Sequence, residues 1–290
     1  MKNSSIVVLD IGGTKINIGR FSGDIICCSQ KHVFESGASN EQIFSFITSL
    51  IDGVLTDDVT AISIGVPSIV DTEQGLVFDA VNIQAWQKEP LKTKLGQHYG
   101  LPVYINNDVN CFTFGEYVSG KSDQNEDIVG LCLGTGFGAG MVLKSQLYTG
   151  HNCCAGELGA IKYLNSTIDD YCSGQFFKHQ YNACGAELAV QARSGSESAK
   201  AIFTEFGVHL AAAISQILLI IDPQKIVIGG SVAQSFDLFI DSVWCHLQDF
   251  PYPRVLENLT IEQSSKPDSA LIGAAHLYLQ STATQSRLAN

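Results

Sequence analysis

The stretch Ile128–Leu143, IVGLCLGTGFGAGMVL, is the most informative part of this chain. An apolar run leads into the glycine-rich segment Gly134–Gly140, and a second apolar run begins at Met141. Such a turn between two strands presents backbone N–H groups that no Cβ atom shields, so a phosphate can approach them closely. Thr135 adds one hydroxyl donor at the tip. The stretch therefore predicts a β-hairpin that can bind a phosphate.

The chain carries the same pattern a second time, nearer its N-terminus. Ile6–Phe21, IVVLDIGGTKINIGRF, also has an apolar strand, a Gly-Gly-Thr turn and an alternating strand. The long separation between the two copies indicates duplication of half a protein, not a short solenoid repeat. We therefore expect two halves, each opening with a hairpin that turns on glycine.

Three other interpretations of these turns need to be weighed. Gly134, Gly136 and Ala139 match the dinucleotide pattern G-x-G-x-x-A, and Glu157 follows at about the distance of the ribose-binding acid. That pattern requires a helix next, whereas Gly140–Leu143 is typical of a strand, which disfavours a nicotinamide site. The N-terminal GGTK lacks the P-loop spacing. Two tight hairpins without a ligand remain an alternative, which the threonine in both copies disfavours.

Composition bounds the class of protein. With 290 residues, 45% of them hydrophobic and 16% charged, the chain is typical of a soluble globular protein with two domains or one large one. A formal net charge of −12 argues against nucleic acid or an anionic membrane as the main partner. The first apolar run is too short for a signal peptide, and none approaches the roughly 20 residues of a membrane span. Nine cysteines without C-x-x-C spacing indicate reduced, mostly structural thiols in the cytoplasm.

Hydrophobic periodicity predicts strands and helices that alternate in both halves, which gives an α/β protein with mixed sheets. Besides the hairpins, we expect strands at 24–33, 59–67, 103–105 and 225–230, and helices at 41–54, 90–99, 109–119, 169–181, 198–221 and 231–248. The polar run Gly120–Asp127 separates an N-terminal domain, residues 1–119, from a C-terminal domain, residues 120–268. A last helix, from 269 to between 280 and 285, is expected to pack back on the first domain.

Asp108 is the first candidate for a catalytic residue. It lies where a predicted strand ends and a helix begins, which is where functional groups gather in open α/β sheets. A carboxylate there could accept the proton of an alcohol that attacks phosphorus, and Asn106, Asn107 and Asn110 could bind hydroxyl groups. The alternative, on equal footing at this point, is that Asp108 only caps the following helix.

Five motifs, in this order, together resemble the ROK family of sugar kinases and sugar-responsive repressors: DIGGTK, NND, LGTGFGAG, GELG and DPQKIVIGGSV. The resemblance runs from Ile6 to about Leu279. It implies the actin-like, duplicated ribonuclease-H-like fold, with two domains and with ATP and sugar in the cleft between them. This agrees with the internal duplication of the glycine-turn hairpin.

The resemblance also implies roles for individual positions. It identifies Asp108 as the catalytic base for the sugar's 6-hydroxyl. The nucleotide and its magnesium ion would be held by two phosphate loops and an adenosine-binding turn, with Asp10 near the metal: Asp10, Gly12, Gly13, Thr14, Lys15, Gly134, Thr135, Gly136, Gly229 and Gly230. The sugar would contact the following side chains: Asn82, Asn107, Asp108, Glu157 and Asp169.

The chain departs from the family pattern in one region. The family's G-E-x-G-H reads Gly156–Ala160 here, so its histidine is missing, and the cysteine-rich zinc segment is replaced by KYLNSTID, Lys162–Asp169. Because a structural zinc needs four ligands, we expect no zinc. Asp169 then aligns with the family's second sugar-binding acid and is one methylene shorter; alternatively, it only caps the helix that follows.

These observations lead to one expected function and two alternatives. We expect an ATP- and Mg²⁺-dependent kinase that phosphorylates O6 of a hexose or N-acetylhexosamine, of the glucose, allose, fructose or N-acetylmannosamine type. A ROK repressor would need a helix-turn-helix before the first phosphate loop, which begins at Asp10. The other alternative is a catalytically weak sugar sensor, which the alanine at position 160 keeps open. We expect a small-molecule sugar as partner, no nucleic acid or membrane, and a homodimer.

Overall fold

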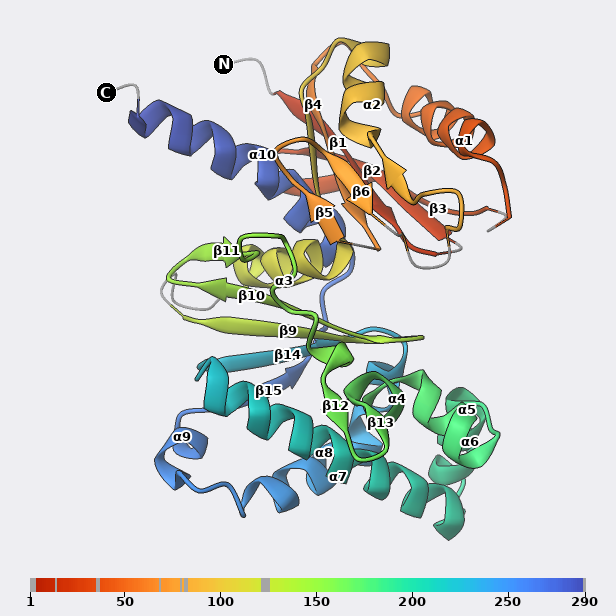
Figure 1. Cartoon of the computed structure of the whole chain (residues 1–290), viewed down its shortest axis with the longest axis vertical. Helices are drawn as coiled ribbons and strands as arrows, with labels where there is room; N and C mark the ends of the chain where they lie inside the picture. Colours follow the sequence, from red (N-terminus) through yellow and green to blue (C-terminus); the bar gives the residue numbers. More distant parts are fainter. Residues whose placement is uncertain are drawn as a thin grey trace. The chain divides into compact units, whose positions relative to one another are not determined.

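A computed structural model describes residues 4–13, 15–34, 37–67, 69–78, 80, 83–120 and 126–288. Contacts divide the chain into two compact units. The first consists of Met1–Lys121, Leu147–Ala155 and Lys266–Asn290, and the second of Ser122–Gln146 and Gly156–Ser265. Both units are α/β (Figure 1).

The first unit is built on a five-stranded sheet with the order β3-β2-β1-β4-β8. β1 pairs with β2 in an antiparallel hairpin and with β4 in parallel, and β4 pairs in parallel with β8. The strands are β1 Ser5–Ile11, β2 Lys15–Ser22, β3 Ile25–Val33, β4 Val59–Val66 and β8 Val103–Asn107. A small antiparallel sheet adds β5 Ile69–Asp71, β6 Leu76–Phe78 and β7 Lys88–Glu89.

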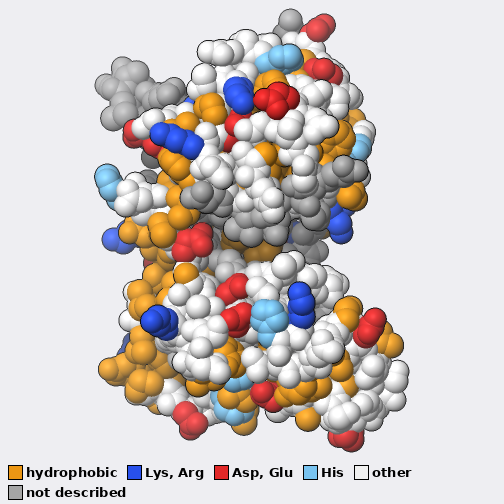
Figure 2. Space-filling model, turned by 45° about the vertical axis from the view of Figure 1, so that its right-hand side comes forward, with side chains coloured by type: hydrophobic (Ala, Val, Ile, Leu, Met, Phe, Trp, Pro, Cys, Tyr) orange, Lys and Arg blue, Asp and Glu red, His pale blue; other side chains and the backbone are white. Residues whose placement is uncertain are grey.

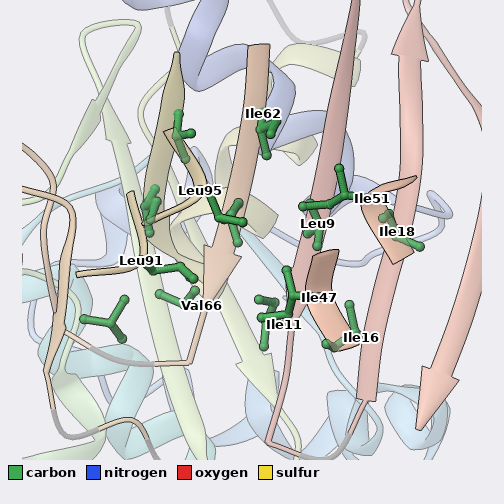
Figure 3. Packing of buried hydrophobic residues seen from close by; sticks show 14 of the residues in the cluster. Leu9, Ile11, Ile16, Ile18, Ile47, Ile51, Ile62, Val66, Leu91 and Leu95 are labelled. Atoms are coloured by element: carbon green, nitrogen blue, oxygen red, sulfur yellow. The ribbon is translucent and has the colours of Figure 1, made fainter. Parts of the chain in front are cut away.

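Helices cover both faces of this sheet, because successive side chains of a strand point to opposite faces. Leu9 and Ile11 of β1 pack in one cluster with Ile47 of α1 and Leu91 of α2, as Figure 3 shows. Ile6 and Val8, which alternate with them along the strand, pack in a second cluster with residues of α3 and α10. The helices are α1 Asn40–Asp52, α2 Leu91–Tyr99, α3 Asp108–Ser119 and α10 Ser269–Leu288.

Helices α3 and α10 cross at two glycines. A Cβ atom on Gly115 would lie 1.7 Å from the carbonyl oxygen of Ser269, and one on Gly273 would lie 1.7 Å from that of Cys111. The hydroxyl of Ser269 donates to Glu116 at 2.5 Å, which helps to satisfy a buried carboxylate. The last helix therefore packs tightly on the first unit, beside the helix that begins with Asp108.

The second unit repeats the first unit's sheet, with the order β11-β10-β9-β14-β15. β9 and β10 form the antiparallel hairpin, and β9, β14 and β15 are parallel neighbours. The hairpin–parallel–parallel arrangement is thus the same in both units, as expected for a duplicated half. The strands are β9 Ile128–Leu133, β10 Phe137–Leu143, β14 Lys225–Gly229 and β15 Thr260–Gln263. The edge strand β11, Gln146–Tyr148, begins at the last residue of the segment Ser122–Gln146 of the second unit, and its other two residues are counted with the first unit.

Six α-helices are described in the second unit. They are α4 Ile168–Cys172, α5 Gly174–Tyr181, α6 Gly185–Arg193, α7 Glu197–Ile220, α8 Phe236–Leu247 and α9 Pro253–Glu257. Short 3-10 turns lie at Leu158–Ala160 and Val232–Ser235, and a two-stranded hairpin joins β12 Lys162–Tyr163 to β13 Ser166–Thr167. Helix α7 is long and apolar enough to cross a membrane by length and composition alone. Its Phe206 packs against Phe177 and Phe239, so core packing explains this composition.

Several predicted elements need correction. The helix expected at 169–181 is two helices, because Ser173 has extended backbone and caps α5 through its side chain. By contrast, the helical segment expected at 198–221 is confirmed as the single helix α7. The last helix runs to Leu288, past its expected end. Helix α6 and strand β15 were not predicted; β15 alternates poorly, since only Ile261 of its four residues is buried.

Candidate functional site

Three parallel strands of the first unit bring the DIGGTK and NND motifs together. In the sheet register, Asp10 of β1 lies opposite Gly65 of β4, which lies opposite Asn106 of β8. A Cβ atom on Gly65 would approach the Cα atom of Asp108 to 3.3 Å. Glycine at position 65 therefore lets the first turn of α3 lie close to the ends of the strands.

The carboxylate of Asp10 is desolvated by its surroundings, which disfavours its ionised form. Burial raises the pKa of Asp10, while a hydrogen bond from Asn17 and the positive charge of Lys31 oppose the shift. The Asn17 Nδ2 atom donates to Asp10 Oδ2 at 2.9 Å. A desolvated carboxylate favours a nearby cation, and carboxylate oxygens are ligands that magnesium prefers. The donor chemistry of Asp10 thus fits a Mg²⁺ ion that arrives with a nucleotide.

The buried thiol of Cys111, in the first turns of α3, links Asp10 to Asp108. Burial raises the pKa of Cys111 well above its usual value, and the charges of Asp10 and Asp108 raise it further. Both carboxylates therefore lie within electrostatic range of one sulfur atom. The raised pKa keeps the Cys111 thiol in its protonated form.

In the NND motif, Asn107 caps helix α3 and Asp108 presents a carboxylate. The side-chain oxygen of Asn107 accepts hydrogen bonds from the backbone N–H groups of Val109 and Asn110, at 2.8 and 3.1 Å, so Asn107 is the N-cap of α3. Asn106 is buried and accepts from the Asn107 N–H and from the Asn110 side chain. Asp108 is the first helical residue, and its Oδ1 accepts from the Val109 N–H at 2.9 Å. The helix does not depend on Asp108 for its cap.

In the second unit, the glycine turn between β9 and β10 is held from outside by the start of α5. The Gly174 N–H donates to the Gly134 carbonyl at 2.8 Å, and the Ser173 hydroxyl donates to the Thr135 carbonyl at 3.2 Å. A Cβ atom on Gly174 would lie 2.8 Å from the same Gly134 oxygen. The Gly134 N–H donates to the Gly136 carbonyl within the turn. These contacts fix the backbone of a loop predicted to bind phosphate.

A cavity of about 630 Å³ opens beside this turn, within the second unit. Its wall combines the turn, the basic side chains of Lys178 and Arg193, and apolar groups, and none of the described lining residues is acidic. Arg193 is held by Asp237, at 2.6 Å, and by the carbonyl of Gln234. The lining residues are Gly134, Thr135, Gly174, Gln175, Phe177, Lys178, Asn182, Ala183, Cys184, Gly185, Ala186, Ala189, Arg193, Phe203, Ser231, Val232, Gln234 and Ser235. Its size and charge suit a nucleotide.

The Gly229–Gly230 turn leads directly into this cavity wall. Gly230 has a φ of +88°, which favours glycine, and a Cβ atom there would lie 2.4 Å from the Leu133 carbonyl oxygen. The residue after it, Ser231, lines the cavity. The end of β14 therefore packs against the end of β9, where the glycine turn begins.

Both glycines of the GELG motif pack so closely against the backbone of strand β10 that a side chain would not fit. A Cβ atom on Gly156, which has a φ of +101°, would lie 2.0 Å from the Ala139 carbonyl oxygen, and one on Gly159 would lie 2.5 Å from that of Phe137. Glu157 between them keeps its side chain exposed, and desolvation by its surroundings raises the pKa of its carboxyl. The packed glycines hold Glu157 at a fixed place, and Ala160 is exposed at the end of the same turn.

Asp169 makes two hydrogen bonds within the second unit. Its Oδ1 accepts from the Phe137 N–H at 2.5 Å, and its Oδ2 accepts from the Gln175 side chain at 3.2 Å. It is not the N-cap of α4, which begins one residue earlier, after Thr167. Neither the sugar-binding nor the capping interpretation anticipated these contacts, because no sequence motif marks either partner.

The remaining predicted positions fall into two groups. Thr14 and Asn82 lie outside the described residues. In the first glycine turn, the Gly12 N–H donates to the Lys15 carbonyl at 2.8 Å, which closes the hairpin, and Gly13 lies between them.

Among the described residues, no three His, Cys, Asp or Glu side chains gather as a metal site. On the face that Figure 2 presents, the described Lys and Arg side chains stand apart instead of forming a basic patch.

The segment that replaces the family's cysteine-rich region is stabilised by aromatic residues. Tyr163 of β12 contacts His209 of α7 through its hydroxyl, 3.1 Å from Nδ1, and Tyr171 of α4 packs on both rings. Burial lowers the pKa of His209, partly offset by Glu205. This Tyr163–Tyr171–His209 cluster was not predicted, since its members are separated in sequence.

Comparison with known proteins identifies relatives over most of the chain. A glucokinase of Streptomyces coelicolor is 28% identical over 271 residues, covering 81% of this chain and 84% of that protein. An N-acetyl-D-glucosamine kinase of Haemophilus influenzae is 30% identical over 266 residues, covering 81% of this chain and 86% of that protein. A ROK family glucokinase from Streptomyces griseus, solved with glucose and AMPPNP, has a TM-score of 0.78 at 26% identity, covering 94% of this chain and 99% of that chain.

These relatives confirm the predicted fold class, the duplicated actin-like, ribonuclease-H-like fold. They are sugar kinases by name, and the repeated sheet order in the two units is the topological form of the duplication. The family model for ROK proteins matches residues 6–281. The chain belongs to the ROK family.

Proposed function

We propose that this protein is an ATP- and Mg²⁺-dependent sugar kinase that phosphorylates O6 of a hexose or N-acetylhexosamine. One observation carries the proposal: Asp10 and Asp108, from two motifs far apart in the chain, both lie beside Gly65 of β4. Asp10 is the partner of Gly65 in the sheet register, and the Cα atom of Asp108 lies 3.3 Å from the place of a Cβ on Gly65. One carboxylate suits a metal ion and the other suits a hydroxyl group, which is the pair that phosphoryl transfer needs. The sugar kinases among the relatives support the reaction class.

On the nucleotide side, we assign the cavity beside the second glycine turn to ATP. Backbone N–H groups and the Thr135 hydroxyl suit phosphate oxygens. The apolar wall, with Phe177 and Val232, suits a base and ribose, and Lys178 adds positive charge. The turn between Asp10 and Lys15 serves as a second phosphate loop in this proposal. A magnesium ion held with ATP at Asp10 would neutralise charge on the phosphates.

On the sugar side, Asp108 accepts the proton of the 6-hydroxyl as that oxygen attacks the terminal phosphorus of ATP. The new P–O bond forms at O6, the bond to the leaving oxygen breaks, and ADP departs with the electron pair. Because Asn107 caps α3, the Asp108 side chain is anchored at the helix start without being needed for the cap. We assign Asn82, Asn107 and Glu157 to the other sugar hydroxyls.

The substrate class is narrowed by position 160, where alanine stands in place of a hydrogen-bonding side chain. A smaller, less polar wall beside Glu157 favours a bulkier substituent or another anomer at the sugar carbons it faces. We propose further that the kinase works in the cytoplasm, as the absence of C-x-x-C spacing among its nine cysteines suggests, and as a homodimer.

A coupled ADP-release screen tests the proposal. Glucose, allose, fructose, mannose, N-acetylglucosamine and N-acetylmannosamine are offered with ATP and Mg²⁺, and Asp108→Asn is run as the matched inactive control. We expect sugar-dependent ADP release from the wild-type protein with at least one sugar. Calorimetric binding of sugar without turnover by the wild-type protein would favour the catalytically weak sensor instead.

A further inference from the structure

The three asparagines on either side of Asp108 form a closed ring of hydrogen bonds. The Asn106 side-chain oxygen accepts from the Asn107 backbone N–H at 2.8 Å and from the Asn110 side-chain amide at 3.0 Å. The Asn107 side-chain oxygen accepts from the Asn110 backbone N–H at 3.1 Å, which closes the ring. The ring therefore joins the last two residues of β8 to the first turn of α3, and Asp108 lies on the backbone between its members.

This ring also fixes which way round the Asn110 amide lies. Because the donor from Asn107 is a backbone N–H, the Asn106 atom that accepts from it must be the side-chain oxygen. The Asn110 atom that faces this oxygen must then be the amide nitrogen, since two acceptors cannot bond to each other. The other end of the amide is Asn110 Oδ1, and this buried oxygen has no hydrogen-bond partner among the described residues.

An unpaired buried acceptor makes Asn110 unfavourable for packing alone. The residue is only 1% exposed. A buried polar atom without a partner destabilises the folded state by at least as much as one neutral hydrogen bond stabilises it. An apolar side chain of similar shape would avoid this penalty. An asparagine at this place, two residues after Asp108, therefore points to a role in the site and not in stability.

We propose that Asn110 is a positioning residue: through Asn106 it fixes the junction of β8 and α3, and thereby the direction in which Asp108 presents its carboxylate. A general base must lie within hydrogen-bond reach of the proton that it accepts, and a displacement of about 1 Å can lower a rate about 100-fold. The inference rests on the proposed kinase function, in which Asp108 is the base. It differs from the hydroxyl-binding role that the sequence suggested for Asn110, since this side chain is buried and held by Asn106.

The test compares Asn110→Leu with the matched control Thr113→Val. Thr113 is also buried in α3, and its hydroxyl donates to the Val109 carbonyl, so the control removes a polar group of the same helix outside the ring. Asn110→Leu removes both the hydrogen bond to Asn106 and the unpaired oxygen, so its melting temperature should be unchanged or higher. We expect kcat to fall about 10- to 100-fold, with the KM values for ATP and for the sugar that gives the most ADP within about threefold. The control should keep the wild-type kcat.

A second variant separates positioning from a clash of the leucine side chain. Asn110→Ala should show the same loss of kcat, with a lower melting temperature because it leaves a cavity. The double variant Asn106→Ala/Asn110→Leu should lose no more kcat than the worse single variant, because both side chains act through one contact.

Three results would overturn the inference. They are a folded Asn110→Leu variant with wild-type kcat, a raised sugar KM with unchanged kcat, and failure of both Asn110 variants to fold, which would make Asn110 a structural residue. In each of these cases an active wild-type protein leaves the kinase proposal standing. Wild-type protein that phosphorylates no sugar would instead sink the kinase proposal, and this inference with it.

Discussion

The two glycine turns occupy the same place in two copies of one sheet, yet the acid beside each has different surroundings. In the first turn, Asp10 lies in the strand itself and is desolvated, with Asn17 as its described hydrogen-bond donor. In the second, Asp169 comes from a separate helix and binds the turn's backbone and Gln175. The first arrangement suits a carboxylate that meets a cation. The shared sheet topology is therefore accompanied by acids with different hydrogen-bond partners beside the two turns.

The largest effect is expected from Asp108→Asn, which removes the proposed base beside the first turn. We predict a kcat lower by about 10²–10⁴-fold, the usual contribution of a general base, with sugar affinity within about tenfold. Because Asn107 caps α3, the melting temperature should change little. Steady-state rates and calorimetric sugar binding check this, with Asp241→Asn, at an exposed position of α8, as a control. An unchanged kcat would leave Asp108 a structural residue only.

Asp10→Asn should separate activity from stability. Burial raises the pKa of Asp10, so the protonated form stabilises the folded state at low pH and this contribution is lost as pH rises through the raised pKa. At neutral pH the ionised group is therefore unfavourable, and the neutral amide removes that penalty while still accepting from Asn17. We predict a rate lower by about 10²–10³-fold with an unchanged or higher melting temperature. A clear fall in melting temperature would contradict this description of Asp10.

A pair of glycine substitutions sharpens the contrast between the turns. Gly174→Ala introduces a Cβ atom 2.8 Å from the Gly134 carbonyl, whereas the nearest atom to a Cβ on Gly12 is the Lys15 carbonyl oxygen at 3.4 Å. We predict that Gly174→Ala destabilises the protein by about 1–3 kcal/mol and weakens nucleotide binding. Gly12→Ala should be milder in chemical denaturation, since its turn is closed by its own hairpin. Equal effects on stability would show that α5 does not hold the second turn.

The smallest effect concerns pH and the second unit's aromatic cluster. Burial lowers the pKa of His209, so the unfolded chain takes up the proton more readily than the folded one. Stability should therefore fall as pH drops below about 6.5, the pKa of a free histidine. His209→Phe should flatten this part of a plot of melting temperature against pH. An unchanged slope in the variant would place the pH dependence elsewhere.

The sequence was sufficient to predict the fold because the hairpin repeat and the alternation of β1 are local, strong signals. Gly100, predicted to end a helix, does so with a φ of +66°. Asp10, Gly65 and Asn106 then meet through parallel pairing, which follows from the order of elements. The predicted junction of a strand and a helix placed Asp108 at the start of α3, but it did not show that Asn107, and not Asp108, caps this helix.

The contacts of Asp169 could not have been predicted in the same way. They depend on the break at Ser173, which turns one expected helix into two and directs Gln175 back towards Asp169. Helical periodicity runs through that break without a signal, because Ser173 is followed by another helical segment. The Tyr163–Tyr171–His209 cluster likewise joins α4, α7 and the β12 strand through tertiary packing alone.

The central claim, that this ROK protein transfers phosphate from ATP to a sugar hydroxyl, is tested most directly by phosphorus NMR of the reaction products. Wild-type protein is incubated with ATP, Mg²⁺ and the sugar that gives the most ADP, beside the Asp108→Asn variant. The account predicts a sugar phosphate coupled to the protons on C6, in amounts equal to ADP, and almost none with the variant. ADP accompanied only by inorganic phosphate, or equal product from the variant, would contradict it.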